Sequence, residues 1–141
     1  MLLFLILLYW YAALPYNVVD GDTIDAVIDV GFHERRDERL RLVWYNEGTI
    51  VGVDTPELRS RDAQERERAQ AAKAYTESWL ASHAAMNTAT LHWADQDVAY
   101  FVVRTEKDDA FGRWLADVRD QQGNSLGKDL LDSGYAVVWT P

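Results

Sequence analysis

The sequence NVVDGDTIDAVIDV, residues 17–30, joins a strand pattern to a pair of carboxylates. Its second part, residues 23–30, alternates apolar and polar side chains, which is typical of a strand with one buried face. Its first part places Asp20 and Asp22 on either side of Gly21, where two negative charges repel each other. Either these residues form a solvated turn, or a cation sits between the carboxylates.

The composition describes one folded domain and excludes some classes of site. The chain has 141 residues, 48% of them hydrophobic and six of them Trp, so it is long and apolar enough to bury a core. It has no Cys, which excludes disulfides and thiolate metal sites and leaves the cellular compartment undecided. The net charge of -9 argues against a protein that holds nucleic acid through basic residues alone.

The first 15 residues, MLLFLILLYWYAALP, form an uncharged apolar run. A membrane-spanning helix needs about 20 such residues, and the run lacks the basic start of a signal peptide. Two interpretations stay open: a secretion or anchor segment, with membrane association through residues 2–14, or a buried first strand. We therefore expect an apolar segment over residues 1–16 and the folded domain over residues 17–141.

The pattern of the remaining chain predicts an α+β domain built on a small barrel. A long helix is expected at 63–85, with Asp62 as N-cap and Glu65 completing a capping box, and a short helix at 125–133. The buried face of the long helix is predicted to consist of Ala71, Ala72, Tyr75 and Trp79. The polar stretch 31–38 reads as a connection, and strands are predicted at 23–30, 39–44, 49–53, 90–93, 98–105, 113–119 and 135–139.

Four sequence pieces occur in the order VVDGDTID (18–25), RLRLV (39–43), GVDTPE (52–57) and DAFGRWLADV (109–118). A fifth piece, SLGKDLLDSGYAV (125–137), follows them. Together they resemble the staphylococcal nuclease (thermonuclease) family over about residues 18–138. The resemblance implies a five-stranded OB-type β-barrel with one long and one short helix packed against it. It also implies calcium-dependent hydrolysis of phosphodiester bonds in DNA or RNA; we expect a monomer.

The resemblance assigns the metal ligands to Asp22, Asp54 and the carbonyl of Thr55. Calcium is a hard cation that takes carboxylate and carbonyl oxygens, so these residue types suit it. Asp20 would lie just outside the ligands and order water around the metal. A cation at this position would relieve the repulsion between Asp20 and Asp22.

The resemblance assigns the catalytic and substrate-binding roles to Glu57, Arg41 and Arg113. A carboxylate held beside the metal, as Glu57 would be, accepts a proton from the attacking water or orients that water. Two guanidinium groups bind the phosphate oxygens bidentately and stabilise the charge that builds on them. A surface ion pair is the alternative reading of Arg113.

The chain departs from the family pattern between Arg41 and Asp54. Removing WYNEGTIV, residues 44–51, restores the usual spacing, so these residues read as an insertion. If they loop out as a hairpin, Arg41 stays in the site. If TIVGV (49–53) replaces the usual strand, Thr49 takes the place of the arginine and Arg41 is displaced. We expect the hairpin. A second departure is Phe111, where the family has a tyrosine.

Two classes of function follow from these residues. The first is a calcium-dependent nuclease, favoured because Asp22, Asp54 and Glu57 are all present. The second is a catalytically impaired domain of the same fold that binds nucleic acid or protein, favoured by the acidic charge and by the insertion. The sequence does not distinguish a DNA substrate from an RNA substrate.

Overall fold

The computed structural model describes residues 10–108 and 112–140, and the stretch 1–9 and Phe111 lie outside this part. The boundary expected between residues 16 and 17 falls inside the first strand. The elements within the described residues are β1 (Trp10–Asp20), β2 (Thr23–Gly31), β3 (Glu34–Asn46), β4 (Thr49–Asp54), α2 (Ala63–Ala84), β5 (Thr90–Trp93), β6 (Gln96–Ala99), β7 (Phe101–Asp108), β8 (Arg113–Arg119), α3 (Leu126–Asp132) and β9 (Val137–Trp139).

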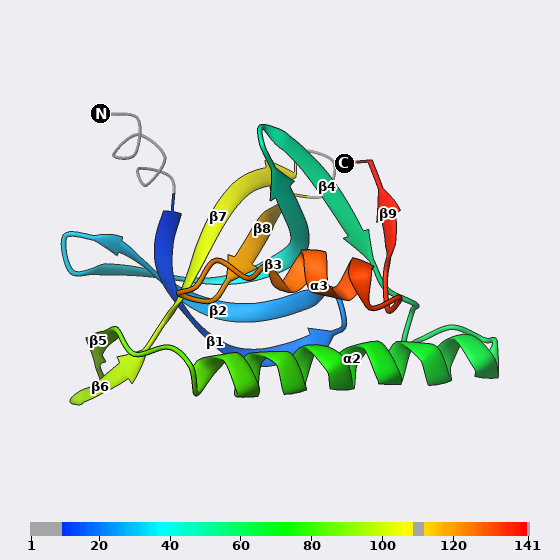
Figure 1. Cartoon of the computed structure of the whole chain (residues 1–141), viewed down its shortest axis with the longest axis horizontal. Helices are drawn as coiled ribbons and strands as arrows, with labels where there is room; N and C mark the ends of the chain where they lie inside the picture. The colour runs from blue at the N-terminus through cyan, green and yellow to red at the C-terminus, as the bar shows by residue number, and fades with distance from the viewer. Residues whose placement is uncertain (1–9, 109–111, 141) are drawn as a thin grey trace.

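Five of the strands close into a barrel. Strands β2, β1, β7, β8 and β3 are hydrogen-bonded in that order, and β2 also pairs with β3, which completes the ring. Strand β3 runs parallel to β8, and the other four pairings are antiparallel. Figure 1 shows the long helix α2 lying along one side of this barrel. The predicted five-stranded OB-type barrel with one long and one short helix is confirmed.

The alternating pattern of β2 fills the barrel. Ile24, Ala26 and Ile28 are buried, at intervals of two residues, because successive side chains of a strand point to opposite faces. They pack with side chains from the other strands and from both helices, among them Leu40, Leu42, Val103, Val118, Trp79, Leu126 and Leu130. The core is therefore a single cluster that spans the barrel and its two helices.

Two strand predictions were wrong in extent. The stretch 31–38 is not a connection, because β2 and β3 continue to pair as far as Gly31 and Glu34. Arg35 of this stretch pairs with Asp29 across the two strands, with its Nη2 3.8 Å from Oδ2 of the aspartate. The predicted strand 98–105 is divided at Tyr100 into β6, which pairs with β5, and β7, which belongs to the barrel.

Helix α2 packs one side of its surface on the barrel. The Asp62 side chain caps it by accepting a hydrogen bond from the backbone N–H of Gln64 at 3.0 Å, as predicted. The predicted buried face is only partly right, because Ala71 is exposed and Tyr75 is half-buried. The buried residues of the helix are Ala69, Ala72, Thr76 and Trp79. The small residues on this face let the helix lie close to the turn between β1 and β2.

Helix α3 covers the barrel beside β3. Ser125 caps it, and Leu126 and Leu130 are fully buried. A Cβ atom added at Gly127 would lie 2.5 Å from the carbonyl oxygen of Val43, so only glycine allows the helix to rest on β3 at this point. The indole N–H of Trp79 donates to Asp129 at 2.8 Å, which joins α3 to α2.

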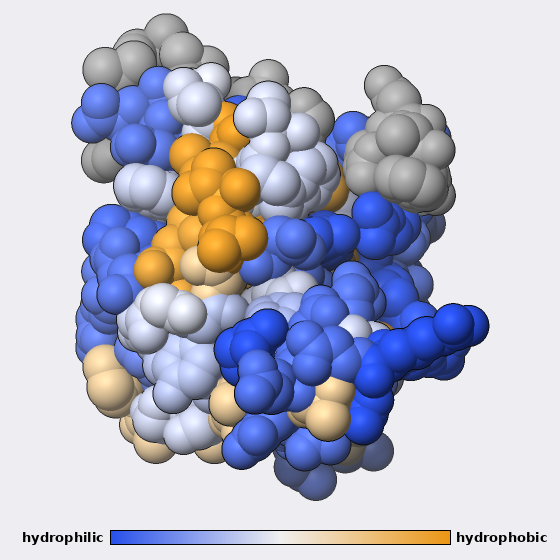
Figure 2. Space-filling model, turned by 90° about the vertical axis from the view of Figure 1, so that its right-hand side faces the viewer, coloured by the Kyte–Doolittle hydropathy of each residue, from blue (hydrophilic) through white to orange (hydrophobic). Residues whose placement is uncertain are grey.

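Strand β4 leaves the barrel and forms an outer ladder with β9. Gly52, Val53 and Asp54 pair with Trp139, Val138 and Val137, and β9 has no further neighbour within the described part of the sheet. Figure 2 shows an exposed hydrophobic strip on this side of the molecule, where Val137 and Val138 are 66% and 64% exposed. In residues 10–108 and 112–140, no helix has both the length and the apolar character needed to cross a membrane.

Candidate active site

The turn between β1 and β2 is fixed against helix α2. Gly21 and Asp22 form a two-residue turn, since Asp20 pairs with Thr23. A Cβ atom at Gly21 would lie 2.8 Å from Cβ of Ala72 and 2.9 Å from the methyl group of Thr55, so a larger residue would force the turn away from the helix. The carbonyl oxygen of Gly21 also accepts a hydrogen bond from the buried hydroxyl of Thr76 at 2.7 Å.

Asp22 is buried, with 4% of its surface exposed, so it is not part of a solvated turn. Its Oδ1 accepts a hydrogen bond from the hydroxyl of Thr23 at 2.9 Å. Its Oδ2 accepts one from the backbone N–H of Thr55 at 3.0 Å. This second bond joins the β1–β2 turn to the loop that follows β4, which brings the two acidic segments of the sequence together.

Asp20 lies beside Asp22 and shares its surroundings. Its Oδ1 accepts a hydrogen bond from the backbone N–H of Asp22 at 3.1 Å. Burial, together with the hydrogen bond and the negative charge of the Asp22 carboxylate, raises the pKa of Asp20 to about 7. The pair therefore carries a charge that the neighbouring protein groups do not fully compensate.

Arg41 meets the carboxylates from strand β3. Its Nη2 lies 2.9 Å from Oδ1 of Asp54 and 3.4 Å from Oδ2 of Asp22, and only 14% of its side chain is exposed. The side chains of Asp22 and Asp54 thus lie within reach of one nitrogen atom. The Nε of Arg41 is buried and makes no hydrogen bond within the described residues. Arg41 therefore joins two carboxylates that come from the β1–β2 turn and from the end of β4.

Of the two arrangements expected for residues 44–51, the structure has the hairpin. Trp44, Tyr45 and Asn46 pair with Val51, Ile50 and Thr49, which extends β3 and β4 outward from the barrel. Arg41 keeps its place in the barrel, opposite Thr23 of β2 and Leu115 of β8. Thr49 lies at the tip of the hairpin, away from the arginine position.

Thr55 and Glu57 follow strand β4 into the site. Thr55 is buried, and its hydroxyl has no hydrogen-bond partner among the described residues. Glu57 is exposed, and its backbone N–H donates to Oε1 of Glu65 at 3.4 Å. Glu65 also accepts a hydrogen bond from the hydroxyl of Ser60. The predicted capping box is therefore wrong, because Glu65 holds the Glu57 loop and not the N–H of Asp62.

Arg113 begins strand β8, two residues before Leu115, which pairs with Arg41. Residues two apart on a strand share a face and lie about 6.6 Å apart, and neighbouring strands are about 4.8 Å apart. The register therefore places the Cα atoms of Arg113 and Arg41 on the order of 8 Å apart on one face of the sheet. The register thus brings the two arginines predicted from the sequence onto neighbouring strands.

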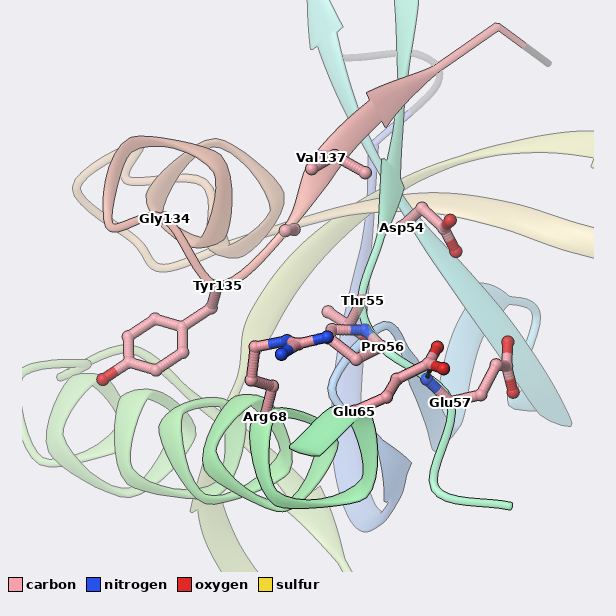
Figure 3. Close-up of a pocket in the computed structure, with 10 residues that line it drawn as sticks. Asp54, Thr55, Pro56, Glu57, Glu65, Arg68, Gly134, Tyr135 and Val137 are labelled. Atoms are coloured by element: carbon pink, nitrogen blue, oxygen red, sulfur yellow. Dashed lines mark hydrogen bonds between the residues drawn. The ribbon is translucent and has the colours of Figure 1, made fainter. Parts of the chain in front are cut away.

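A pocket of about 330 Å³ opens beside Asp54. Figure 3 shows the carboxylates of Asp54 and Glu57 at one end of this pocket and Tyr135 at the other, with Arg68 between them. Arg68 is an exposed residue of α2 and belongs to no recognisable motif. Tyr135 lies in the sequence piece SLGKDLLDSGYAV, but that piece assigned it no role.

The donors of the site suit a hard cation in their chemistry. They are the carboxylates of Asp22 and Asp54 and the oxygens of Thr55, and calcium prefers oxygen ligands of this kind. The unpartnered hydroxyl of Thr55 and the uncompensated charge of Asp20 are consistent with a cation. No group of three or more His, Cys, Asp or Glu side chains that could hold a metal is found in residues 10–108 and 112–140.

The barrel and this cluster define an OB-type domain with a carboxylate–arginine site. The family model described as Staphylococcal nuclease homologue matches residues 49–140, which is more than half of the chain. The chain belongs to this family, which is of the nuclease type. The match includes Asp54, Glu57 and Arg113, whereas Asp22 and Arg41 precede it and are joined to the site by the contacts above. No curated protein matches the chain.

Proposed function

We propose that the protein is a calcium-dependent nuclease that hydrolyses phosphodiester bonds of DNA, RNA or both. The observation that carries this proposal is the meeting of Arg41 with Asp22 and Asp54, at 3.4 and 2.9 Å. These three residues come from three separate segments, and the loop with Glu57 follows Asp54 directly. Stability alone does not require a half-exposed carboxylate and a buried guanidinium beside a pocket.

Asp22, Asp54 and Thr55 are the residues that would hold calcium. When bound, calcium would offset the negative charge of these carboxylates and polarise a phosphoryl oxygen of the substrate. Each oxygen of Asp22 accepts one hydrogen bond from the protein, and a carboxylate oxygen has two lone pairs, so both keep an acceptor position. The Asp54 side chain is 44% exposed and is open to the pocket.

Glu57 and the two arginines would carry the reaction. The oxygen of a water molecule attacks phosphorus, the bond from phosphorus to the leaving oxygen breaks, and that oxygen takes up a proton. Glu57 is exposed at the pocket and would accept the proton that the attacking water loses, or orient that water. Arg41 and Arg113 would donate hydrogen bonds to the phosphate oxygens as their charge increases.

The second candidate function is nucleic-acid or protein binding without turnover. The contact of Arg41 with both carboxylates favours it, because a guanidinium that stays on Asp54 has fewer donors for a phosphate. The net charge of -9 gives a binding-only domain little electrostatic attraction for nucleic acid, so the charge favours this candidate only with a protein as the partner.

The experiment that tests the proposal is cleavage of plasmid DNA, single-stranded DNA and RNA with calcium and with a chelator. The variants are Asp22→Asn and Arg41→Lys, and the control is Arg39→Lys, which lies on the same strand but pairs with Asp25. Arg41→Lys should lose activity by on the order of a hundredfold, because an ammonium group lacks the bidentate fork. Arg39→Lys should behave like the unchanged protein.

Cleavage that survives the chelator would contradict the calcium assignment. Absence of cleavage of all three substrates, with binding of an oligonucleotide retained, would establish the second candidate function. Equal activity of Arg41→Lys and Arg39→Lys would remove Arg41 from the reaction.

A further inference from the structure

The guanidinium group of Arg41 is held from two directions. On one side, its Nη2 contacts Asp54 and Asp22 at 2.9 and 3.4 Å. Its central carbon lies 5.2 Å from the centre of the Trp139 ring, which is within the range of a cation–π contact. The carboxylates alone fix where the group lies, and the aromatic ring restricts how it rotates.

Gly52 makes room for the Trp139 ring. The two residues are directly opposite in the ladder between β4 and β9. A Cβ atom at Gly52 would lie 2.7 Å from two ring carbons and 2.3 Å from the carbonyl oxygen of Trp139, so any larger residue would push the ring away. Gly52 and Asp54 are two residues apart and face the same side of β4. The ring and the carboxylate that hold Arg41 therefore lie side by side.

Strand β9 does not contribute to the core in a way that explains Trp139. It is three residues long, lies at the edge of the sheet, and exposes both valines that precede the tryptophan. The indole Nε1 is buried without a hydrogen-bond partner in the described residues, which is unfavourable for stability. A leucine or methionine would fill the space without that cost, so packing alone does not account for an aromatic residue here.

We propose that Trp139 is a positioning residue, seated by Gly52, that orients the Arg41 guanidinium toward the phosphate of the substrate. This inference rests on the proposed nuclease function. Trp139 contacts the arginine and not the reacting atoms, so its effect is on how well Arg41 is aligned when charge builds on the phosphate. Nothing in the sequence pattern indicates this pairing, since 98 residues separate the two positions.

The test compares Trp139→Phe, which keeps an aromatic face, with Trp139→Met, which has an apolar side chain without a ring. The control is Trp93→Met, because Trp93 stacks on Arg35 at 4.6 Å outside the site. For a short oligonucleotide, Trp139→Met should lower kcat about tenfold, equivalent to about 1.4 kcal/mol, with KM little changed. Trp139→Phe should keep most of the wild-type kcat, and Trp93→Met should not alter kcat.

A double-mutant cycle tests whether the loss of kcat in Trp139→Met depends on Arg41. In the Arg41→Lys background, Trp139→Met should cost little further, because the group that it orients is already gone. A full tenfold loss in that background, or equal losses in Trp139→Phe and Trp139→Met, would overturn the proposal. Thermal melting of each variant shows whether it is folded before its kinetics are compared.

A measurement on the unchanged protein does not depend on how the variants fold. The NMR resonance of the Arg41 Nε–H, assigned by its loss in Arg41→Lys, should lie upfield of its random-coil position because the Trp139 ring shields it. A resonance at the random-coil position would overturn the proposal whatever the kinetics. If the protein cleaves nothing and yet shows the shift, the proposed nuclease function fails while the contact stands; if it cleaves and Trp139→Met has full kcat, only the positioning role fails.

Discussion

Two groups of aspartates in this protein differ in how fully the chain itself satisfies them. The structural aspartates, Asp117 and Asp120, are 1% and 0% exposed and are surrounded by donors. Asp120 accepts hydrogen bonds from the backbone N–H groups of Gln122 and Asn124 and from the Asn124 side chain, and it pairs with His83 at 2.7 Å. Burial would raise the pKa of Asp120, but the hydrogen bonds from Asn124 and His83 outweigh it and hold the pKa below its ordinary value.

The site aspartates, Asp20, Asp22 and Asp54, lack this compensation. Burial and the neighbouring Asp22 raise the pKa of Asp20 to about 7, the reverse of the shift at Asp120. Arg41 is shared between Asp22 and Asp54, and the nearby hydroxyl of Thr55 has no partner within the described residues. A carboxylate with a structural role is hydrogen-bonded and neutralised by the chain itself. A carboxylate that binds a ligand keeps negative charge that the protein does not neutralise.

The largest expected effect is on turnover and lies at Glu57, in the loop that follows the site residue Asp54. Glu57→Gln keeps the shape of the side chain but removes its ability to accept a proton. We expect kcat to fall by ~10²–10⁴ and the melting temperature to stay the same. Glu67→Gln, an equally exposed change on α2, is the control. Near-normal turnover of Glu57→Gln in a steady-state cleavage assay would remove Glu57 from the mechanism.

The next largest effect should be a loss of stability when a structural aspartate, Asp120, is replaced. Asp120→Ala leaves several buried donors without a partner, and we expect the free energy of unfolding in urea to fall by roughly 3–5 kcal/mol. The folded fraction should keep its specific activity. Asp97→Ala, at a side chain that is 72% exposed, should change stability by less than about 0.5 kcal/mol. A small loss in Asp120→Ala would show that the donors find water instead.

The same residue predicts how stability depends on pH. Because the folded-state pKa of Asp120 is lowered, its contribution is present above the ordinary Asp pKa of about 3.9 and is lost as the pH falls through the folded value. The stability difference between the unchanged protein and Asp120→Asn should therefore be constant near neutral pH and shrink in acid. A difference that grows on acidification would show that the shift has the opposite sign.

The stabilisation of the folded protein by calcium should be a smaller effect, and it should depend on the site aspartates. A ligand that binds only the folded state stabilises it by about 2.7 kcal/mol at a hundred times its Kd. We expect calcium to raise the melting temperature of the unchanged protein and of Asp97→Ala, and not that of Asp22→Asn. An equal rise in all three proteins would show that calcium does not bind through Asp22.

The smallest expected effect is a gain in stability, the opposite of the loss expected at Asp120. Asp20→Asn keeps an acceptor for the backbone N–H of Asp22 and removes the repulsion between the two carboxylates. In the presence of a chelator we expect unfolding to become harder by up to about 1 kcal/mol, whereas Asp120→Asn becomes easier to unfold. Destabilisation by both changes would show that the two groups are not different in kind.

The structure differs from the predictions made from the sequence mainly at polar residues. The polar run 31–38 reads as a loop, yet its Arg35 pairs with Asp29 across two strands, because side chains on the outer face of an antiparallel ladder need only be compatible with water and with each other. Glu65 stands at the right distance for a capping box, yet it binds the Glu57 loop, since that loop folds back over the start of α2.

The sequence by itself determined the features that depend on neighbours along the chain. The Asp20–Gly21–Asp22 turn, the Asp62 cap and the buried alternation of β2 follow from local conformation and periodicity. The order of the pieces 18–25, 39–43, 52–57 and 109–118, matched to a family, was sufficient to predict the barrel and to group Asp22 with Asp54.

Tertiary structure alone decided how that group is arranged. Because residues 44–51 read as an insertion, the sequence allowed two positions for Arg41. Only the pairing of β3 with β2 and β8 selects the position beside Asp22 and Asp54. The seat of Trp139 on Gly52 is likewise a product of strand register. The physical reason is that a turn or a cap is stabilised by adjacent residues, whereas a contact across a sheet depends on pairings that many distant side chains fix together.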